Sequence, residues 1–218
     1  MGVCYDGMLC EEYKTAPVKI AWVLKEALCD GCLSEQLENA INNKQANPTW
    51  RTMAYPTYAV IRGYENSEFP EWENVPGLKQ DILKILRQVA VVNAKKEACT
   101  AKNGHSDNGE IIAEYLVNRD AIKRQLMELD ADIIVFGYPE KLGCIVEDVF
   151  RTMTGKNYCI DTRFGDFAST IADVNGKRRL FLWGYHPGYY HSEEKGEHSQ
   201  YKYFTAFVDA VRKFRAMK

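Results

Sequence analysis

Three short apolar runs, each ending abruptly in polar residues or glycine, constrain the fold of this chain more than any other feature. They are Lys19–Leu24, Val89–Val92 and Asp132–Phe136, followed in turn by Lys25-Glu26, Asn93 and Gly137. Continuous apolar runs of this length are typical of strands buried on both faces of a parallel sheet. We therefore expect the three segments to lie together at the centre of a sheet.

Amphipathic patterns between these runs predict helices. The expected helices run from Ser34 as cap to about Lys44, from Pro76 through Leu86, from the Asp107/Glu110 capping pair to Leu129, from Lys141 to Thr152, and through Phe204–Phe214. Strands that alternate with such helices predict an α/β fold, a three-layer α/β/α sandwich with a central, mostly parallel sheet.

Three other segments carry more local predictions. Asn175-Gly176 predicts a hairpin between strands Phe167–Val174 and Arg179–Trp183. Tyr158–Asp161 is expected to be a short strand. The aromatic-rich segment 50–64 is expected to be broken at Pro56, and residues 65–77 to form an irregular surface excursion.

Composition narrows the class of protein. With 46% hydrophobic and 27% charged residues and no repeat or linker, residues 1–218 are expected to form one globular domain, most simply a monomer. A net charge of -2 disfavours a protein that coats duplex nucleic acid, and no apolar stretch approaches the ~20 residues of a membrane span.

The cysteines and the first residues of the chain indicate its cellular compartment and whether it holds a metal site. Seven scattered cysteines and a start without an apolar leader predict a cytoplasmic protein with reduced thiols. Cys29 and Cys32 form a C-x2-C pair that Cys4 and Cys10 could join. Because a second such pair or a paired-histidine motif is missing, we expect no metal site.

Polar residues leave the predicted strands where α/β proteins bind ligands, at the carboxyl edge of the sheet. Glu26, Asn93 and His186 each follow a strand, so a carboxylate, an amide and an imidazole should converge there. Such a set can orient a water, read a heterocycle and stabilise an anion. Each also has a structural interpretation: Glu26 as a turn cap, Asn93 as an Asx turn, His186 as a constrained loop residue.

Basic and aromatic residues leave two interpretations open. Lys95 and Lys96, with Lys177 and Arg178, form either a solvated face or a patch that contacts phosphates. Lys25 either pairs with a phosphate or neutralises Glu26. Trp50 and Tyr55 belong either to the core or to a surface that stacks on a base.

The order of these residues resembles the uracil-DNA glycosylase superfamily, and its uncharacterised bacterial branch more than the well-studied enzymes. The resemblance covers about residues 5 to 190. It is carried by Asp6-Gly7 with Tyr13, Lys19–Ala27, Val91–Lys96, Gln125-Leu126 running into Ala131–Gly137, and Tyr185-His186-Pro187-Gly188.

The resemblance implies a base-excision enzyme that acts on DNA or another nucleic acid without metal or cofactor. It implies that Glu26 positions the hydrolytic water, Asn93 reads a flipped uracil and His186 stabilises the departing base. Trp50 or Tyr55 would stack on the base, and Lys25, Lys95 and Lys96 would contact phosphates. The iron–sulfur members have a cysteine where this chain has Lys96, so a cluster is not expected.

Departures from the family pattern keep two alternatives open. The active families place Gly before the acidic residue and Pro-Gly after it, whereas Lys25 precedes Glu26 and Ala27 follows. Tyr189 stands where a wedge residue is usual, and either wedges or packs. One alternative is an inactive protein that binds a nucleotide or single-stranded nucleic acid. The other is a hydrolase of small nucleosides, favoured if the pocket has no basic rim.

Overall fold

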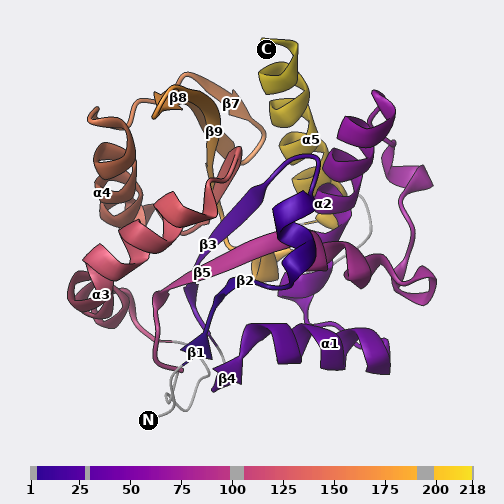
Figure 1. Ribbon diagram of the computed structural model, residues 1–218, viewed down its shortest axis with the longest axis horizontal. Helices are drawn as coiled ribbons and strands as arrows, with labels where there is room; N and C mark the ends of the chain where they lie inside the picture. The colour runs from indigo at the N-terminus through magenta and orange to yellow at the C-terminus, as the bar shows by residue number, and fades with distance from the viewer. Residues whose placement is uncertain (1–3, 28–29, 99–105, 191–198, 218) are drawn as a thin grey trace.

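A computed structural model describes residues 4–27, 30–98, 106–190 and 199–217. In these residues the main sheet has seven strands (Figure 1). In spatial order they are β2 (Gly7–Met8), β5 (Val89–Lys95), β3 (Ile20–Glu26), β6 (Ile133–Gly137), β9 (Lys177–Gly184), β8 (Phe167–Val174) and β7 (Thr162–Phe164). A separate parallel pair joins β1 (Cys4–Tyr5) to β4 (Gly31–Cys32).

The four central strands, β5, β3, β6 and β9, are parallel, and the flanking strands β2, β8 and β7 are antiparallel to their neighbours. The carboxyl ends of the parallel strands therefore share one edge of the sheet. The sequence places Glu26 at the end of β3 and His186 just after β9. Asn93 lies inside β5, because that strand pairs with β3 as far as Lys95, three residues beyond the predicted end at Val92.

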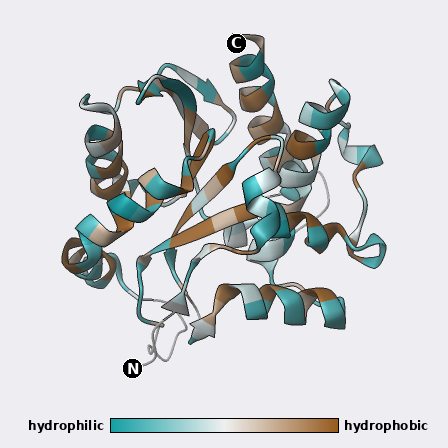
Figure 2. Ribbon diagram, viewed as in Figure 1, coloured by the Kyte–Doolittle hydropathy of each residue, from teal (hydrophilic) through white to brown (hydrophobic). Residues whose placement is uncertain are grey.

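Helices cover both faces of the sheet, which confirms a layered α/β fold. On one side lie α1 (Leu33–Asn43), α2 (Pro48–Asn66) and α5 (Gln200–Ala216); on the other lie α3 (Asn108–Leu129) and α4 (Gly143–Thr154) (Figure 1). A hydrophobic core lies on each side of the sheet, and alternate residues of β3 belong to one or the other. Trp22 packs with α5, whereas Val23 packs in the cluster with α3 and α4. Because both faces are covered, each central strand contains a continuous apolar stretch (Figure 2), and its polar residues lie toward its ends.

Several local predictions are confirmed. Asn175 and Gly176 connect β8 to β9 with φ of +53° and +76°, the left-handed pair that a tight two-residue hairpin needs. Asp107 caps α3 by accepting a hydrogen bond from Glu110 N at 2.9 Å. The apolar faces predicted for α1, α3 and α5 are buried.

The segment with Pro56 is the main correction. Residues 50–64 lie within one continuous helix, α2, and Pro56 is inside it. A proline within a helix costs about 3 kcal/mol, because it removes one backbone hydrogen bond and crowds the preceding turn. Burial of residues such as Met53, Val60 and Ile61 against the sheet offsets that cost.

Other boundaries also differ. The segment after Pro76 forms two 3-10 helices, Leu78–Gln80 and Ile82–Gln88, separated by Asp81 at φ +63°. Tyr158–Asp161 is not a strand, since the neighbouring β7 begins at Thr162. Cys32, and not Ser34, is the N-cap of α1. No helix in the described part of the chain is both long and apolar enough to cross a bilayer.

Candidate functional site

A cavity of about 470 Å³ opens at the carboxyl edge of β3 and β5. Its walls come from five places in the sequence: the end of β3, the middle of β5, the starts of α1 and α2, and the turn after β9. The lining residues are Leu24, Lys25, Glu26, Ala27, Leu33, Gln36, Asn47, Pro48, Thr49, Trp50, Val91, Asn93, His186, Gly188 and Tyr189. The topology thus brings Glu26, Asn93 and His186 into one cavity.

Glu26 is the last residue of β3 and is only 7% exposed. Its carboxylate accepts a hydrogen bond from the backbone N–H of Ser106, with distances of 3.0 and 3.3 Å to the two oxygens. Ser106 directly precedes the N-cap of α3, so the donor lies at the start of that helix. A carboxylate has about four lone-pair sites, so one such donor leaves capacity to orient a water.

Asn93 is buried between β3 and β2, with its α-carbon opposite that of Leu24. Its backbone N–H donates to Asp6 Oδ2 at 2.7 Å. The second oxygen of Asp6 accepts from Lys96 Nζ, also at 2.7 Å. A charged pair therefore anchors the backbone that presents the Asn93 amide to the cavity.

His186 is held by a short local hydrogen bond. It caps the 3-10 helix Pro187–Tyr189, and its Nδ1 accepts from Gly188 N at 3.1 Å. Because an accepting nitrogen carries no proton, this hydrogen bond assigns the proton of the neutral ring to Nε2. The ring then has an N–H donor for an anion or carbonyl oxygen.

The three lysines predicted to contact phosphates are placed differently. Lys25 lines the cavity and is half-buried. Lys95 is buried instead, and its Nζ donates to Ser106 Oγ at 2.8 Å and pairs with Glu110 at 2.5 Å. Lys96 pairs with Asp6 and Gln125. The structure does not bring Lys95 or Lys96 to the cavity, because both are paired with carboxylates of the chain.

The two aromatic candidates separate in the same way. Trp50 lines the cavity in the first turn of α2. Tyr55 is buried elsewhere, with its ring edge-on to Trp72 at a centroid distance of 4.9 Å. Five residues along a helix correspond to about 140° of rotation, so the two rings leave α2 on different faces. Because a break was expected at Pro56, the sequence did not place Trp50 and Tyr55 on different faces of one helix.

Three further lining residues were not singled out from the sequence. Gln36 comes from α1, whereas Asn47 and Thr49 belong to the start of α2. The Asn47 side chain accepts from Trp50 N at 2.8 Å and so fixes the turn that carries the indole. Asn47-Pro48 is a recognisable helix start, a capping residue followed by proline at the first helical position, and could have located this wall.

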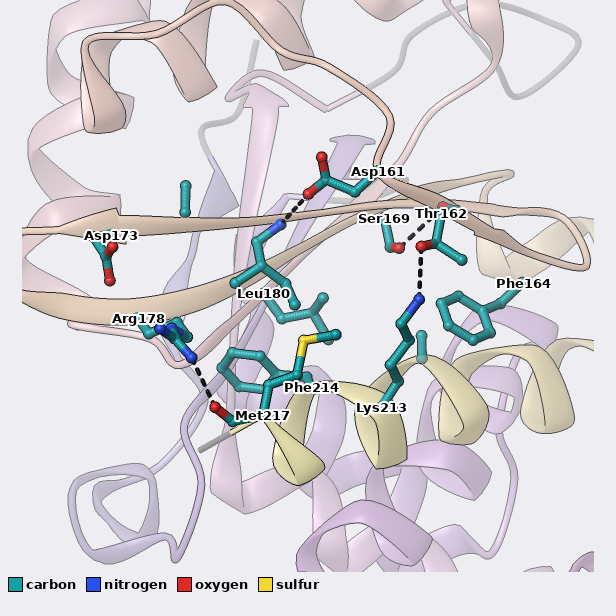
Figure 3. A pocket seen from close by; sticks show the side chains of 13 residues that line it. Asp161, Thr162, Phe164, Ser169, Asp173, Arg178, Leu180, Lys213, Phe214 and Met217 are labelled. Atoms are coloured by element: carbon teal, nitrogen blue, oxygen red, sulfur yellow. Dashed lines mark hydrogen bonds between the residues drawn. The ribbon is translucent and has the colours of Figure 1, made fainter.

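A second, slightly larger cavity of about 520 Å³ lies between the β7–β8–β9 edge and the end of α5 (Figure 3). Several of its polar side chains are engaged with neighbouring groups of the protein. Lys213 Nζ donates to Thr162 Oγ1 at 2.9 Å and Arg178 to Met217 O at 2.7 Å, whereas Asp161 accepts from Ile171 N (Figure 3). The convergence of carboxylate, amide and imidazole is found in the first cavity, which is therefore the candidate site.

No cysteine in the described part of the chain lines the candidate cavity. Within the described ranges, no group of three or more His, Cys, Asp or Glu side chains is arranged to hold a metal ion. Cys29, half of the C-x2-C pair, lies outside those ranges. A hydrogen bond with Ser34 lowers the pKa of the Cys32 thiol, and burial raises the pKa of the Cys10 thiol.

The sequence was also compared with known proteins. A scan against models of protein families finds none that matches the chain, and a search among curated proteins finds no similar sequence.

Proposed function

We propose that this protein hydrolyses the N-glycosidic bond of uracil or another aberrant base that enters the 470 Å³ cavity from a nucleic acid. The observation that carries the proposal is the presence of Glu26, Asn93 and His186 in a single cavity with an aromatic wall at Trp50. These residues come from elements as far apart in sequence as β3 and the turn after β9. The same proposal assigns the chain to the uracil-DNA glycosylase superfamily and to base-excision repair.

The chemistry follows from the charges that develop as the bond breaks. Water attacks C1′ of the sugar, the C1′–N bond breaks, and its electron pair leaves with the base. Positive charge grows on the sugar and negative charge on the base, so a carboxylate near the sugar and a donor at a base oxygen favour the transition state. Glu26 orients the water and accepts its proton, whereas Nε2–H of His186 stabilises the base anion.

Recognition of the base falls to the other two residues. The Asn93 amide offers both a donor and an acceptor, the combination needed to read the edge of a pyrimidine such as uracil. Trp50 provides a flat apolar wall for its π-face. The hydrogen bond to Asp6 holds the Asn93 backbone in place before the base arrives.

One observation favours a second candidate, a hydrolase of small nucleosides. Within the described part of the chain, Lys25 is the one lysine or arginine that lines the cavity. Lys177, another member of the predicted basic set, is paired with Asp130 and Asp132. A cavity with few cations suits an uncharged nucleoside better than a long polyanion.

A glycosylase assay tests the proposal. End-labelled single-stranded and duplex oligonucleotides that contain uracil, hypoxanthine or xanthine are incubated with the protein and then cleaved with alkali at abasic sites. We expect cleavage at one base, and its loss in Glu26→Gln and Asn93→Ala. Glu128→Gln, which changes an exposed carboxylate on α3 outside the cavity, is the matched control.

Free nucleosides are tested in parallel by chromatography of the released base. Cleavage of nucleosides but not of oligonucleotides would select the second candidate. Cleavage of neither, together with base-dependent binding, would select an inactive binding protein. Equal cleavage by wild type and both site variants would identify a contaminating enzyme.

A further inference from the structure

Two tyrosine rings lie stacked on the surface beside the candidate cavity. Tyr185 and Tyr189 are 44% and 48% exposed, and their ring centroids are 5.7 Å apart with 27° between the planes. In the described residues, most large apolar side chains are buried in the two cores. An exposed pair of flat rings is the kind of surface on which another flat ring stacks.

The turn that carries the pair is firmly anchored. The next residue, Tyr190, is fully buried, and its hydroxyl donates to Asp166 at 2.9 Å. Its carbonyl oxygen accepts from Thr52 Oγ1 at 2.7 Å and from Gln200 Nε2 at 3.3 Å. Because the backbone is held in this way, little conformational freedom remains to be lost when a ligand contacts the rings.

The pair connects the cavity to a neighbouring hollow. Tyr189 lines the candidate cavity. Tyr185 lines a hollow of about 150 Å³ that also includes Trp183, Arg163 and the carboxylates Glu140 and Asp166. A nucleotide strand with one base in the cavity would therefore place its adjacent base on the two rings. The strand would continue toward the neighbouring hollow.

We propose that Tyr185 and Tyr189 form a stacking platform for the base adjacent to the target, and that the substrate is single-stranded nucleic acid. The inference rests on the proposed function, in which the cavity takes a base. An unpaired neighbouring base offers a free π-face to the platform, whereas in a duplex that base is paired and stacked on both sides. The scarcity of cations at the cavity also disfavours a duplex, with its two charged backbones.

The test measures binding by fluorescence anisotropy with labelled oligodeoxynucleotides. The target nucleotide is a 2′-fluoro deoxynucleotide of uracil, hypoxanthine or xanthine, each tested in turn, and it resists cleavage because the fluorine destabilises positive charge on the sugar. Three single strands are compared: one complete, one with abasic sites flanking the target, and one with an abasic site in place of the target. A duplex of the complete strand is the fourth ligand. Wild type is compared with Tyr185→Ala, and with Tyr185→Phe as the matched variant that keeps the ring.

We expect wild type to bind the complete strand at least about fivefold more tightly than the strand with abasic neighbours. That ratio should fall toward one in Tyr185→Ala and persist in Tyr185→Phe. Binding of the duplex should be weaker than that of the complete strand. Three results would each contradict the platform: equal affinity of wild type for the complete strand and the strand with abasic neighbours, an unchanged affinity ratio in Tyr185→Ala, or tighter binding of the duplex.

The strand that lacks the target base separates this inference from the proposed function. If its affinity equals that of the complete strand for every target base, the cavity takes none of these bases and the proposed function fails, whatever the effect of the neighbouring bases. If loss of the target base weakens binding but loss of the neighbours does not, the proposed function stands and the platform is overturned.

Discussion

The carboxylate of Asp6 accepts a hydrogen bond from the backbone N–H of Asn93 at 2.7 Å, and this contact ties the β1–β2 connection to the strand that presents the site amide. The same carboxylate pairs with Lys96 at 2.7 Å and accepts from Gln125 Nε2 at 3.1 Å. The Asp6 side chain is 3% exposed. Asp6 does not itself line the cavity, but it supports the backbone of Asn93, which does.

Replacing this carboxylate should weaken both the fold and the site. Asp6→Asn keeps the size of the side chain but leaves the Lys96 ammonium without its anion in a largely buried position. We expect the free energy of unfolding in urea to fall by about 2–3 kcal/mol, the loss typical of a buried charged partner. Glu11→Gln, which breaks the exposed pair with Lys14, is the control and should have little effect. Equal effects of the two variants would contradict the structural role of Asp6.

Stability in acid should depend on Asp130. A hydrogen bond from Arg179, at 2.6 Å, holds the pKa of this carboxyl below its usual 3.8. A lowered pKa contributes stability that is fully present above pH 3.8 and is lost as the pH falls through the folded-state value. Asp130→Asn is a suitable variant, because asparagine tolerates the φ of +47° at this helix end.

Urea titrations at a series of pH values check this expectation. Wild type should be more stable than Asp130→Asn at neutral pH, and the difference should shrink below pH 3.8. Because the Asp130 side chain is half exposed, solvent screens the pair and the difference should be modest. A difference that does not change with pH would show that the carboxylate charge makes no contribution.

Much of the central sheet could be predicted because strands that are buried on both faces contain continuous runs of apolar residues. The convergence of Glu26, Asn93 and His186 followed from a rule of topology: parallel strands of one sheet end at one edge. Tyr55 could not be separated from Trp50, because that requires knowing that Pro56 lies inside a helix.

The partners of the two lysines could not be predicted from the sequence. Lys95 and Lys96 resemble a solvated basic pair, and their partners Glu110 and Asp6 are 15 and 90 residues away in the chain. Ion pairs between distant segments depend on tertiary packing and leave no local pattern. The extra residues of β5 also depend on tertiary packing. The backbone of Lys95 pairs with that of Glu26 in β3, and this pairing extends the strand past Val92.

A methyl group on Gly188 should damage the site more than the fold. A β-carbon there would lie 2.7 Å from Thr49 Oγ1 and 3.1 Å from His186 Nδ1. The contact would displace the turn that carries the imidazole, and a misplacement of about 1 Å can cost 100-fold in rate. We expect Gly188→Ala to lose at least about tenfold in base release or base binding, with little change in melting temperature.

Two further variants make this prediction specific. Gly77→Ala is the matched control, because a β-carbon there meets nothing within 4 Å. Adding Thr49→Ala to Gly188→Ala removes the nearest clashing atom and should restore part of the activity. Full activity of Gly188→Ala alone would mean that the His186 turn is not constrained in the way described.

Salt dependence should distinguish the lysine that lines the cavity from those paired inside the protein. Each phosphate contact on a single strand contributes about -0.7 to the slope of log affinity against log salt concentration. We expect Lys25→Met to make that slope shallower by about this amount, because Lys25 lines the cavity. Lys95→Met should leave the slope unchanged, because Lys95 is paired with Glu110 in the absence of ligand. Anisotropy titrations at several salt concentrations, with circular dichroism to verify folding, give both values. A shallower slope in Lys95→Met would show that this lysine leaves Glu110 to contact the nucleic acid, and would restore it to the phosphate-binding set.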